Sequence, residues 1–172
     1  MFTIAKMARW VVAGTLLLTS VASAQATKAQ ATLAAAMRGG THVALADAIG
    51  TASASGKPLS ARYEFEDGKL QLTVFVEKEG AYSEVFVDYR TGKVAKIDKI
   101  TGGDDLKDAR AQSKASAKVT TTLASAVSKA VADNPGYTAV DVTPVLLSKT
   151  AVTAEVTLMK DGRFKGASEP LR

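Results

Sequence analysis

The chain of 172 residues contains no cysteine and a single histidine, His42. Without cysteine it can have no disulfide, no thiol nucleophile and no thiolate metal site. One histidine excludes a histidine-clustered metal centre, and a Ser-His-Asp triad would depend on His42 alone. Because the sequence shows no nucleophile that reaches His42, we assign this residue no role. We expect a protein that is not an enzyme and carries no metal or cofactor.

Aromatic residues are also scarce, at 6% of the chain, whereas 47% of the residues are apolar. Lysine and arginine number 22 against 17 aspartate and glutamate, a formal charge of +5, and both signs are interspersed along the chain. Nucleic-acid binding would need a basic stripe with stacking aromatics. The composition therefore predicts a folded, modestly basic protein with no nucleic-acid partner.

The first residues have the layout of an export signal. Lys6 and Arg9 precede an apolar run from Trp10 to Leu18, and Ala22-Ser23-Ala24 follows. Cations, an apolar run and then small residues are typical of a secretory signal peptide. A membrane anchor would need about 20 apolar residues, more than this run supplies. We expect cleavage after Ala24 and a mature protein that is periplasmic or secreted and does not span a membrane.

The mature chain contains two passages that align with each other. The helical pattern at 45–49 corresponds to 123–127, and the segment at 74–82 corresponds to 156–164. Their spacing agrees to within about four residues, an ordinary loop difference. This predicts an α+β fold with two tandem repeats, each a helix packed on a three- or four-stranded antiparallel β-meander. The expected divisions are a signal peptide (1–24), an Ala-rich N-terminal segment (25–40), repeat 1 (41–100), a linker or helical lead-in (101–118) and a truncated repeat 2 (119–172).

The turns of repeat 1 predict its strand register. Asp67-Gly68 as a two-residue turn pairs Glu66 with Lys69, and Glu79-Gly80 as the next turn pairs Val74 with Val85. A three-residue turn ending at Gly92, with positive φ, then brings Ile97 opposite Val85 and Ala95 opposite Val87. One face of this sheet is apolar and can be covered by the helix. It comprises Leu59, Ala61, Tyr63, Phe65, Leu70, Leu72, Val74 and Val76.

The second repeat has room for three strands, at 138–147, 151–159 and 163–167. Pro144 interrupts the first of them. Since proline cannot donate to a β-ladder, this strand should lie at a sheet edge or have a bulge at Pro144.

The same register places Phe75, Tyr82 and Phe86 together on the opposite face of repeat 1, where a solvated sheet should be polar. Either the other repeat or the Ala-rich segment 29–37 covers these rings, or they form a docking patch for another protein. Phe75, Tyr82 and Phe86 are therefore the candidate partner-binding residues.

Three carboxylates, Glu64, Glu66 and Asp67, gather near the first turn and could weakly hold a hard cation. The spacing of a calcium-binding loop is absent. We therefore interpret them as solvated turn acids.

The sequence from Tyr82 to Val94, Tyr-Ser-Glu-Val-Phe-Val-Asp-Tyr-Arg-Thr-Gly-Lys-Val, resembles the closing hairpin of PepSY domains. That pattern is an aromatic residue, alternating valines, an aspartate and Thr-Gly-Lys/Glu-Val. Its residues here are Val85, Val87, Asp88, Thr91, Gly92 and Val94, to which we assign structural roles in the core and the turn. The second repeat keeps Val156, Leu158, Asp161, Gly162 and Phe164 but lacks the Val-Asp-x-x-Thr-Gly ending.

The resemblance implies an exported module of the kind found in propeptides of secreted metallopeptidases and as free-standing secreted or periplasmic proteins. Such modules are understood to bind and restrain peptidases. We therefore expect a protein-binding function whose partner is a peptidase or another envelope protein. The alternative is an envelope structural or small-ligand-binding protein with a pocket between the repeats.

Overall fold

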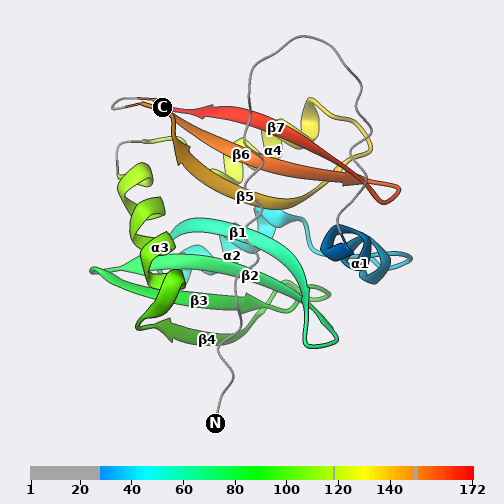
Figure 1. Cartoon of the computed structure of the whole chain (residues 1–172), viewed down its shortest axis with the longest axis horizontal. Coiled ribbons are helices and arrows are strands. Elements are labelled where there is room, and N and C mark those ends of the chain that lie inside the picture. The colour runs from blue at the N-terminus through cyan, green and yellow to red at the C-terminus, as the bar shows by residue number, and fades with distance from the viewer. Residues whose placement is uncertain (1–27, 118, 149–150) are drawn as a thin grey trace.

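A computed structural model describes residues 28–117, 119–148 and 151–172. These residues form four α-helices and one antiparallel sheet of seven strands in the order β4-β3-β2-β1-β5-β6-β7 (Figure 1). The predicted α+β class is confirmed. The expected signal peptide, residues 1–24, lies outside the described residues.

Two helices precede each group of strands along the chain. In the first half, α1 (Lys28–Ala36) and α2 (Leu45–Ala52) come before β1 (Lys57–Glu66), β2 (Lys69–Lys78), β3 (Ala81–Val87) and β4 (Val94–Ile100), with a short 3₁₀ turn at Ser53–Ser55. In the second half, α3 (Gly103–Ser116) and α4 (Leu123–Ala132) come before β5 (Thr138–Leu146), β6 (Val152–Lys160) and β7 (Arg163–Leu171). The Ala-rich segment thus contains α1, and the expected linker or lead-in contains α3.

Helices α2 and α4 pack against each other on one face of the sheet, here called the inner face (Figure 1). Each helix buries a stripe at helical spacing, as the pattern of apolar residues predicts. The stripes are Leu45, Ala48, Ile49 and Ala52 in α2, and Leu123, Ala126, Val127 and Ala130 in α4. One core cluster joins both stripes to inner-face residues of both halves, including Val74, Val85, Val142 and Val156. The two halves therefore share this core.

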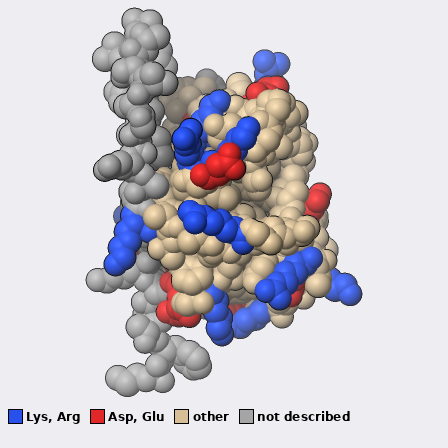
Figure 2. All heavy atoms as spheres, turned by 90° about the vertical axis from the view of Figure 1, so that its right-hand side faces the viewer, with Lys and Arg blue, Asp and Glu red and all other residues tan. Residues whose placement is uncertain are grey.

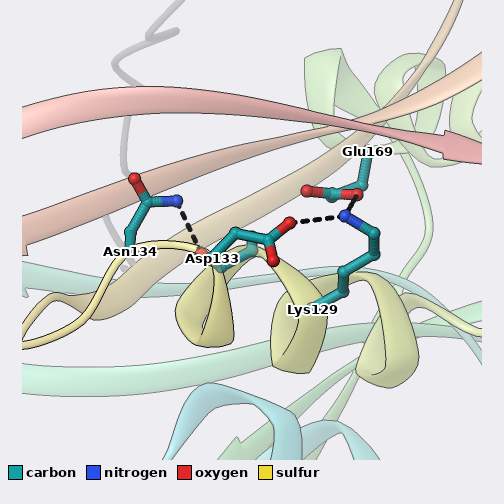
Figure 3. Close-up of polar contacts among 5 residues, drawn as sticks. Lys129, Asp133, Asn134 and Glu169 are labelled. Atoms are coloured by element: carbon teal, nitrogen blue, oxygen red, sulfur yellow. Dashed lines mark hydrogen bonds and ion pairs between the residues drawn. The ribbon is translucent and has the colours of Figure 1, made fainter.

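The end of α4 is tied to the sheet and capped by polar contacts (Figure 3). Lys129 makes ion pairs with Asp133, one turn later, and with Glu169 of β7, at 2.5 and 3.1 Å. Glu169 is only 8% exposed, so Lys129 compensates a nearly buried charge. Asn134 donates from Nδ2 to the carbonyl of Ala130 at 2.7 Å, which satisfies one of the last carbonyls of the helix.

The hairpin registers follow the two-residue turns. The expected pairs Glu66 with Lys69 and Val74 with Val85 are both present, and so is Val85 with Ile97 across the three-residue turn. In that turn the Asp88 carboxylate accepts the N–H groups of Arg90 and Thr91, at 2.9 and 2.8 Å. Gly92 has φ of +71°, a conformation that disfavours side chains.

Two register expectations are wrong, and both fail at a β-bulge. The pairing of β1 with β2 shifts between Pro58 and Ser60, so Leu59 turns away from the inner face and packs with Phe75 and Ala109. The pairing of β3 with β4 shifts after Phe86, so Val87 pairs with Val94 rather than with Ala95. A bulge inserts one unpaired residue and reverses the alternation beyond it, which sequence alternation alone does not reveal.

The expectation for Pro144 is also wrong. β5 pairs with both β1 and β6, so Pro144 is not on an edge strand, and the irregularity of β5 falls between Ala139 and Asp141. The ladder between β1 and β5 contains only Ala61 with Val142 and Arg62 with Asp141. This ladder ends at Val142, before Pro144 is reached. Proline is therefore tolerated, because its missing N–H removes no hydrogen bond to β1.

Helix α3 lies on the opposite face, here called the outer face, in front of the sheet in Figure 1. It contacts β1, β2 and β5. Helix α1 lies at the end of the sheet near the β6–β7 turn, where a Cβ added to Gly162 would sit 3.7 Å from that of Ala34. Among the described helices, none is long and apolar enough to cross a membrane.

Candidate functional site

The outer face of the central strands carries a group of charged side chains, here called the Arg62 cluster. Ala61 and Tyr63 of β1 point into the core, so the alternation of the strand turns Arg62 and Glu64 outward. In register, Arg62 lies between Thr73 of β2 and Asp141 of β5. The cluster comprises Arg62, Glu64, Glu66, Thr73, Glu84, Asp105 and Asp141.

Arg62 lies at the centre of this cluster. Its Nε is 3.1 Å from Oε2 of Glu64, and both side chains are more than two-thirds buried. Its guanidinium carbon lies 4.9 Å from the centroid of the Phe75 ring. A guanidinium over an aromatic face is favourable because the ring carries negative charge density there. Arg62 thus contacts both the Glu64 carboxylate and the Phe75 ring on the outer face.

Four carboxyl groups of the Arg62 cluster have a raised pKa. Burial, reinforced by the charge of Asp105, raises the pKa of Glu84 to about 7. Burial also raises the pKa of Asp141 to about 6, and Arg62 opposes that rise. The pKa values of Glu66 and Asp105 are raised as well, first by burial and then by neighbouring acids. Arg62 is the basic group that lowers the pKa at all four of these described residues, so one guanidinium serves several carboxylates.

Thr73 adds a second unusual feature to the cluster. Its side chain is 1% exposed, and its Oγ1 has no hydrogen-bond partner among the described residues. A buried hydroxyl without a partner costs about 1–3 kcal/mol, so such groups are uncommon in folded proteins. In register Thr73 lies between Arg62 and Phe86. An unused hydroxyl therefore lies beside the only basic residue of the cluster.

Helix α3 completes the cluster by bringing Asp105 close to the sheet. Ala109 packs on Leu59 and Phe75, and three polar contacts anchor the second half of the helix. Ser60 Oγ donates to Gln112 Oε1 at 2.8 Å, Ser113 Oγ donates to Glu77 Oε2 at 2.5 Å, and Lys57 Nζ donates to the Ser116 carbonyl at 2.7 Å. These contacts hold the first turn of α3, with Asp105, over the outer face of the sheet.

The expected aromatic patch is present only in part. Phe75 is 3% exposed, so it offers no docking surface, and the docking alternative is wrong for this residue. The cover is neither the second half's sheet nor segment 29–37 but α3, through Ala109, together with Arg62. Tyr82 is half-buried against the cluster of Leu59, Phe75 and Ala109. Phe86 is half-buried, with the ammonium of Lys96 5.6 Å from its ring centroid.

The remaining sequence candidates have structural surroundings. Val85 and Val87 are buried in the core. His42 is half-buried, stacks on Tyr89 with ring centroids 5.5 Å apart, and has Nδ1 2.9 Å from the Gly40 carbonyl oxygen. Within the described part of the chain, no group of three or more His, Cys, Asp or Glu residues is placed to hold a metal ion.

Sequence reasoning missed the Arg62 cluster because it interpreted Glu64 and Glu66 as solvated turn acids. The strand register already places Glu84 opposite Phe75, which was a usable signal. The register of the strands does not give the position of α3, which covers this part of the outer face. Comparison with known families, with curated proteins and with solved structures gives no match to this chain.

Proposed function

We propose that the mature chain is an exported, non-enzymatic protein-binding module built from two PepSY-like repeats, the second of which is truncated. The partner would lie on the outer face of β3 and β4. One observation carries this proposal: α3 buries Phe75 through Ala109 but leaves Tyr82 and Phe86, on either side of Glu84 in β3, half-exposed. Aromatic side chains that are partly exposed next to charges are typical of protein-docking surfaces.

The order of elements supports the two-repeat interpretation. Each half has two helices followed by antiparallel strands, and the two halves meet through their first strands, β1 and β5. Where the halves meet, β1 and β5 pair antiparallel. Among the described residues, the second half has three strands against four in the first.

The two edges of the sheet favour docking on the face over addition of a strand. β4 carries Lys96 and Lys99, and charged lysines on an edge oppose pairing with another chain. β7 carries Pro170, which cannot donate to a ladder, and the nearly buried Glu169. Both edges are therefore protected, whereas the outer face beyond α3 is not.

Restraint of a peptidase is the specific form of this function that the PepSY resemblance implies. A rigid sheet would act by covering the mouth of the active-site cleft of its partner. The alternative, a pocket for a small ligand between the repeats, has no separate observation in its favour among the described residues.

Affinity capture tests the proposal. The immobilised mature protein should retain a specific partner from cell-envelope extract, identified by mass spectrometry and assayed for peptidase activity. The double variant Tyr82→Ser/Phe86→Ser should lose that partner while keeping its circular dichroism spectrum. Val94→Ser/Ile97→Ser is the matched control, because these residues are also apolar and exposed (40% and 49%). Ile97 pairs with the core residue Val85 and therefore lies on the inner face, away from the proposed docking surface. Equal capture by wild type and the Tyr82/Phe86 variant would refute the proposal.

A further inference from the structure

We infer that the Arg62 cluster is a receptor for a basic side chain, the guanidinium or ammonium of an arginine or lysine in a partner polypeptide. This inference rests on the proposed protein-binding function and names the chemistry of the partner segment. The site lies on the outer face at Glu84, Thr73 and Phe86, next to the first turn of α3.

The charge balance of the cluster is the first reason. Five carboxyls, those of Glu64, Glu66, Glu84, Asp105 and Asp141, interact electrostatically with the one guanidinium of Arg62. Other basic residues nearby do not make up the difference. Lys96, over the Phe86 ring, is already paired with Asp98 at 2.5 Å, Lys57 donates to the Ser116 carbonyl, and Lys107 and Arg110 of α3 are exposed. A cation supplied from outside would relieve the repulsion among these carboxylates.

The unpaired hydroxyl is the second reason, and it is independent of charge. Thr73 Oγ1 is buried, lacks a partner and lies in register between Arg62 and Phe86. A hydroxyl oxygen can accept a hydrogen bond from a guanidinium or ammonium group, both of which only donate. A basic side chain that displaced Arg62 slightly would thus satisfy an oxygen that the folded chain leaves unpaired.

The aromatic rings of this face are the third reason. Phe75 already lies under the Arg62 guanidinium at 4.9 Å, and Phe86 under the Lys96 ammonium at 5.6 Å. Each ring therefore presents one face to a basic side chain. Carboxylates combined with aromatic faces suit arginine and lysine, whereas a hard metal ion prefers oxygen ligands alone.

The test is an NMR titration of the ¹⁵N,¹³C-labelled mature protein with the peptide acetyl-Gly-Arg-Gly-Arg-Gly-amide at about pH 8, where most carboxylates are ionised. We expect saturable shifts confined to Thr73, Glu84, Phe86 and the first turn of α3. Glu84→Gln should weaken binding about tenfold, the loss of one charge-assisted hydrogen bond. Glu155→Gln is the matched control and should bind normally, because Glu155 is a half-buried carboxylate of β6 bonded to Ser168 at 2.7 Å.

A second variant separates binding from folding. Thr73→Val keeps the shape of the side chain and removes the unpaired hydroxyl, so the protein should be at least as stable as wild type to urea and yet bind the peptide more weakly. Equal binding by wild type, Glu84→Gln and Thr73→Val would overturn the inference. So would equal binding of the peptide with glutamate in place of arginine, or saturation of the same residues by calcium chloride alone. Because purified components are used, a negative titration would leave the capture experiment above to decide the proposed function separately.

Discussion

Arg62 of β1 and Asp141 of β5 face each other across the line where the two halves of the sheet meet. The only other registered pair on this line is Ala61 with Val142, in which both side chains are buried in the inner core. Along this line, each half therefore places one apolar residue in the shared core and one charged residue in the Arg62 cluster. The junction of the halves is part of the candidate site.

Replacement of Arg62 should expose how strongly the cluster depends on one cation. Arg62→Met keeps much of the side-chain bulk but leaves Glu64 and Asp141 without their counter-charge. We expect a loss of about 2 kcal/mol in the free energy of unfolding by urea at pH near 8. The loss should be smaller at pH near 5, where Glu84 (pKa about 7) and Asp141 (pKa about 6) are mostly protonated. Arg90→Met, at an exposed turn, is the control and should change little; an equal loss at both pH values would contradict this account.

Glu84 should make the protein less stable as the pH rises. Its pKa is about 7 in the folded protein against an ordinary value of 4.5, so between these values the folded state binds more protons than the unfolded state. The free energy of unfolding therefore falls as the pH rises through this window, and the full penalty is present above about 7. Glu84→Gln should flatten this part of the stability profile measured by urea unfolding from pH 4 to 8. A profile identical to wild type would show that Glu84 ionises normally.

The attachment of α3 should depend on Ala109. This residue is 2% exposed between Leu59 and Phe75, so Ala109→Asp would place an unpaired carboxylate in an apolar contact. We expect hydrogen exchange of the α3 amides to speed up by about tenfold or more, while α4 stays protected. Ala111→Asp is the matched control, since Ala111 is exposed on the same helix. Unchanged exchange in both variants would mean that Ala109 does not hold the helix.

The first half should not fold stably by itself. A fragment of residues 25–100 lacks α4, which packs on α2, and β5, which pairs with β1. With no disulfide to compensate, a core of this size is marginal. We expect the fragment to show no cooperative urea transition under conditions where the mature chain shows one. A stable, cooperative fragment would refute mutual dependence of the halves.

The sequence predicts those parts of the fold that local chemistry determines. Two-residue turns such as Asp67-Gly68 leave little freedom in register, so the pairing of Glu66 with Lys69 and the inner face of repeat 1 follow from them. The bulge at Leu59 does not follow, because it depends on the contact with Ala109 of a helix far along the chain. The position of α3 is equally hidden, since its sequence is mostly polar and buries only Ala109, Ala115 and Ser116.

The candidate site was hard to predict for the same reason. The alternation of the strands correctly places three aromatic residues on one face, Phe75, Tyr82 and Phe86. Their exposure, however, depends on what packs over them. Figure 2 shows the end of the molecule that lies on the right in Figure 1, where basic side chains form separate groups with acidic ones between them rather than a continuous stripe. Scattered charge of this kind is visible in the sequence, whereas the gathering of carboxyls around Arg62 requires the tertiary fold.

The short ladder between β1 and β5 also has a mechanical meaning. β1 pairs with β2 along nearly its whole length but with β5 through Ala61 and Arg62 alone. The line between the halves therefore has fewer registered pairs than the other ladders of the sheet, and bending there would change the angle between two otherwise intact meanders. Helices α2 and α4 pack against each other across this line on the inner face and so restrict the angle between the two meanders. Because Arg62 lies on this line opposite Asp141, bending of the sheet there would change the distance between these two residues.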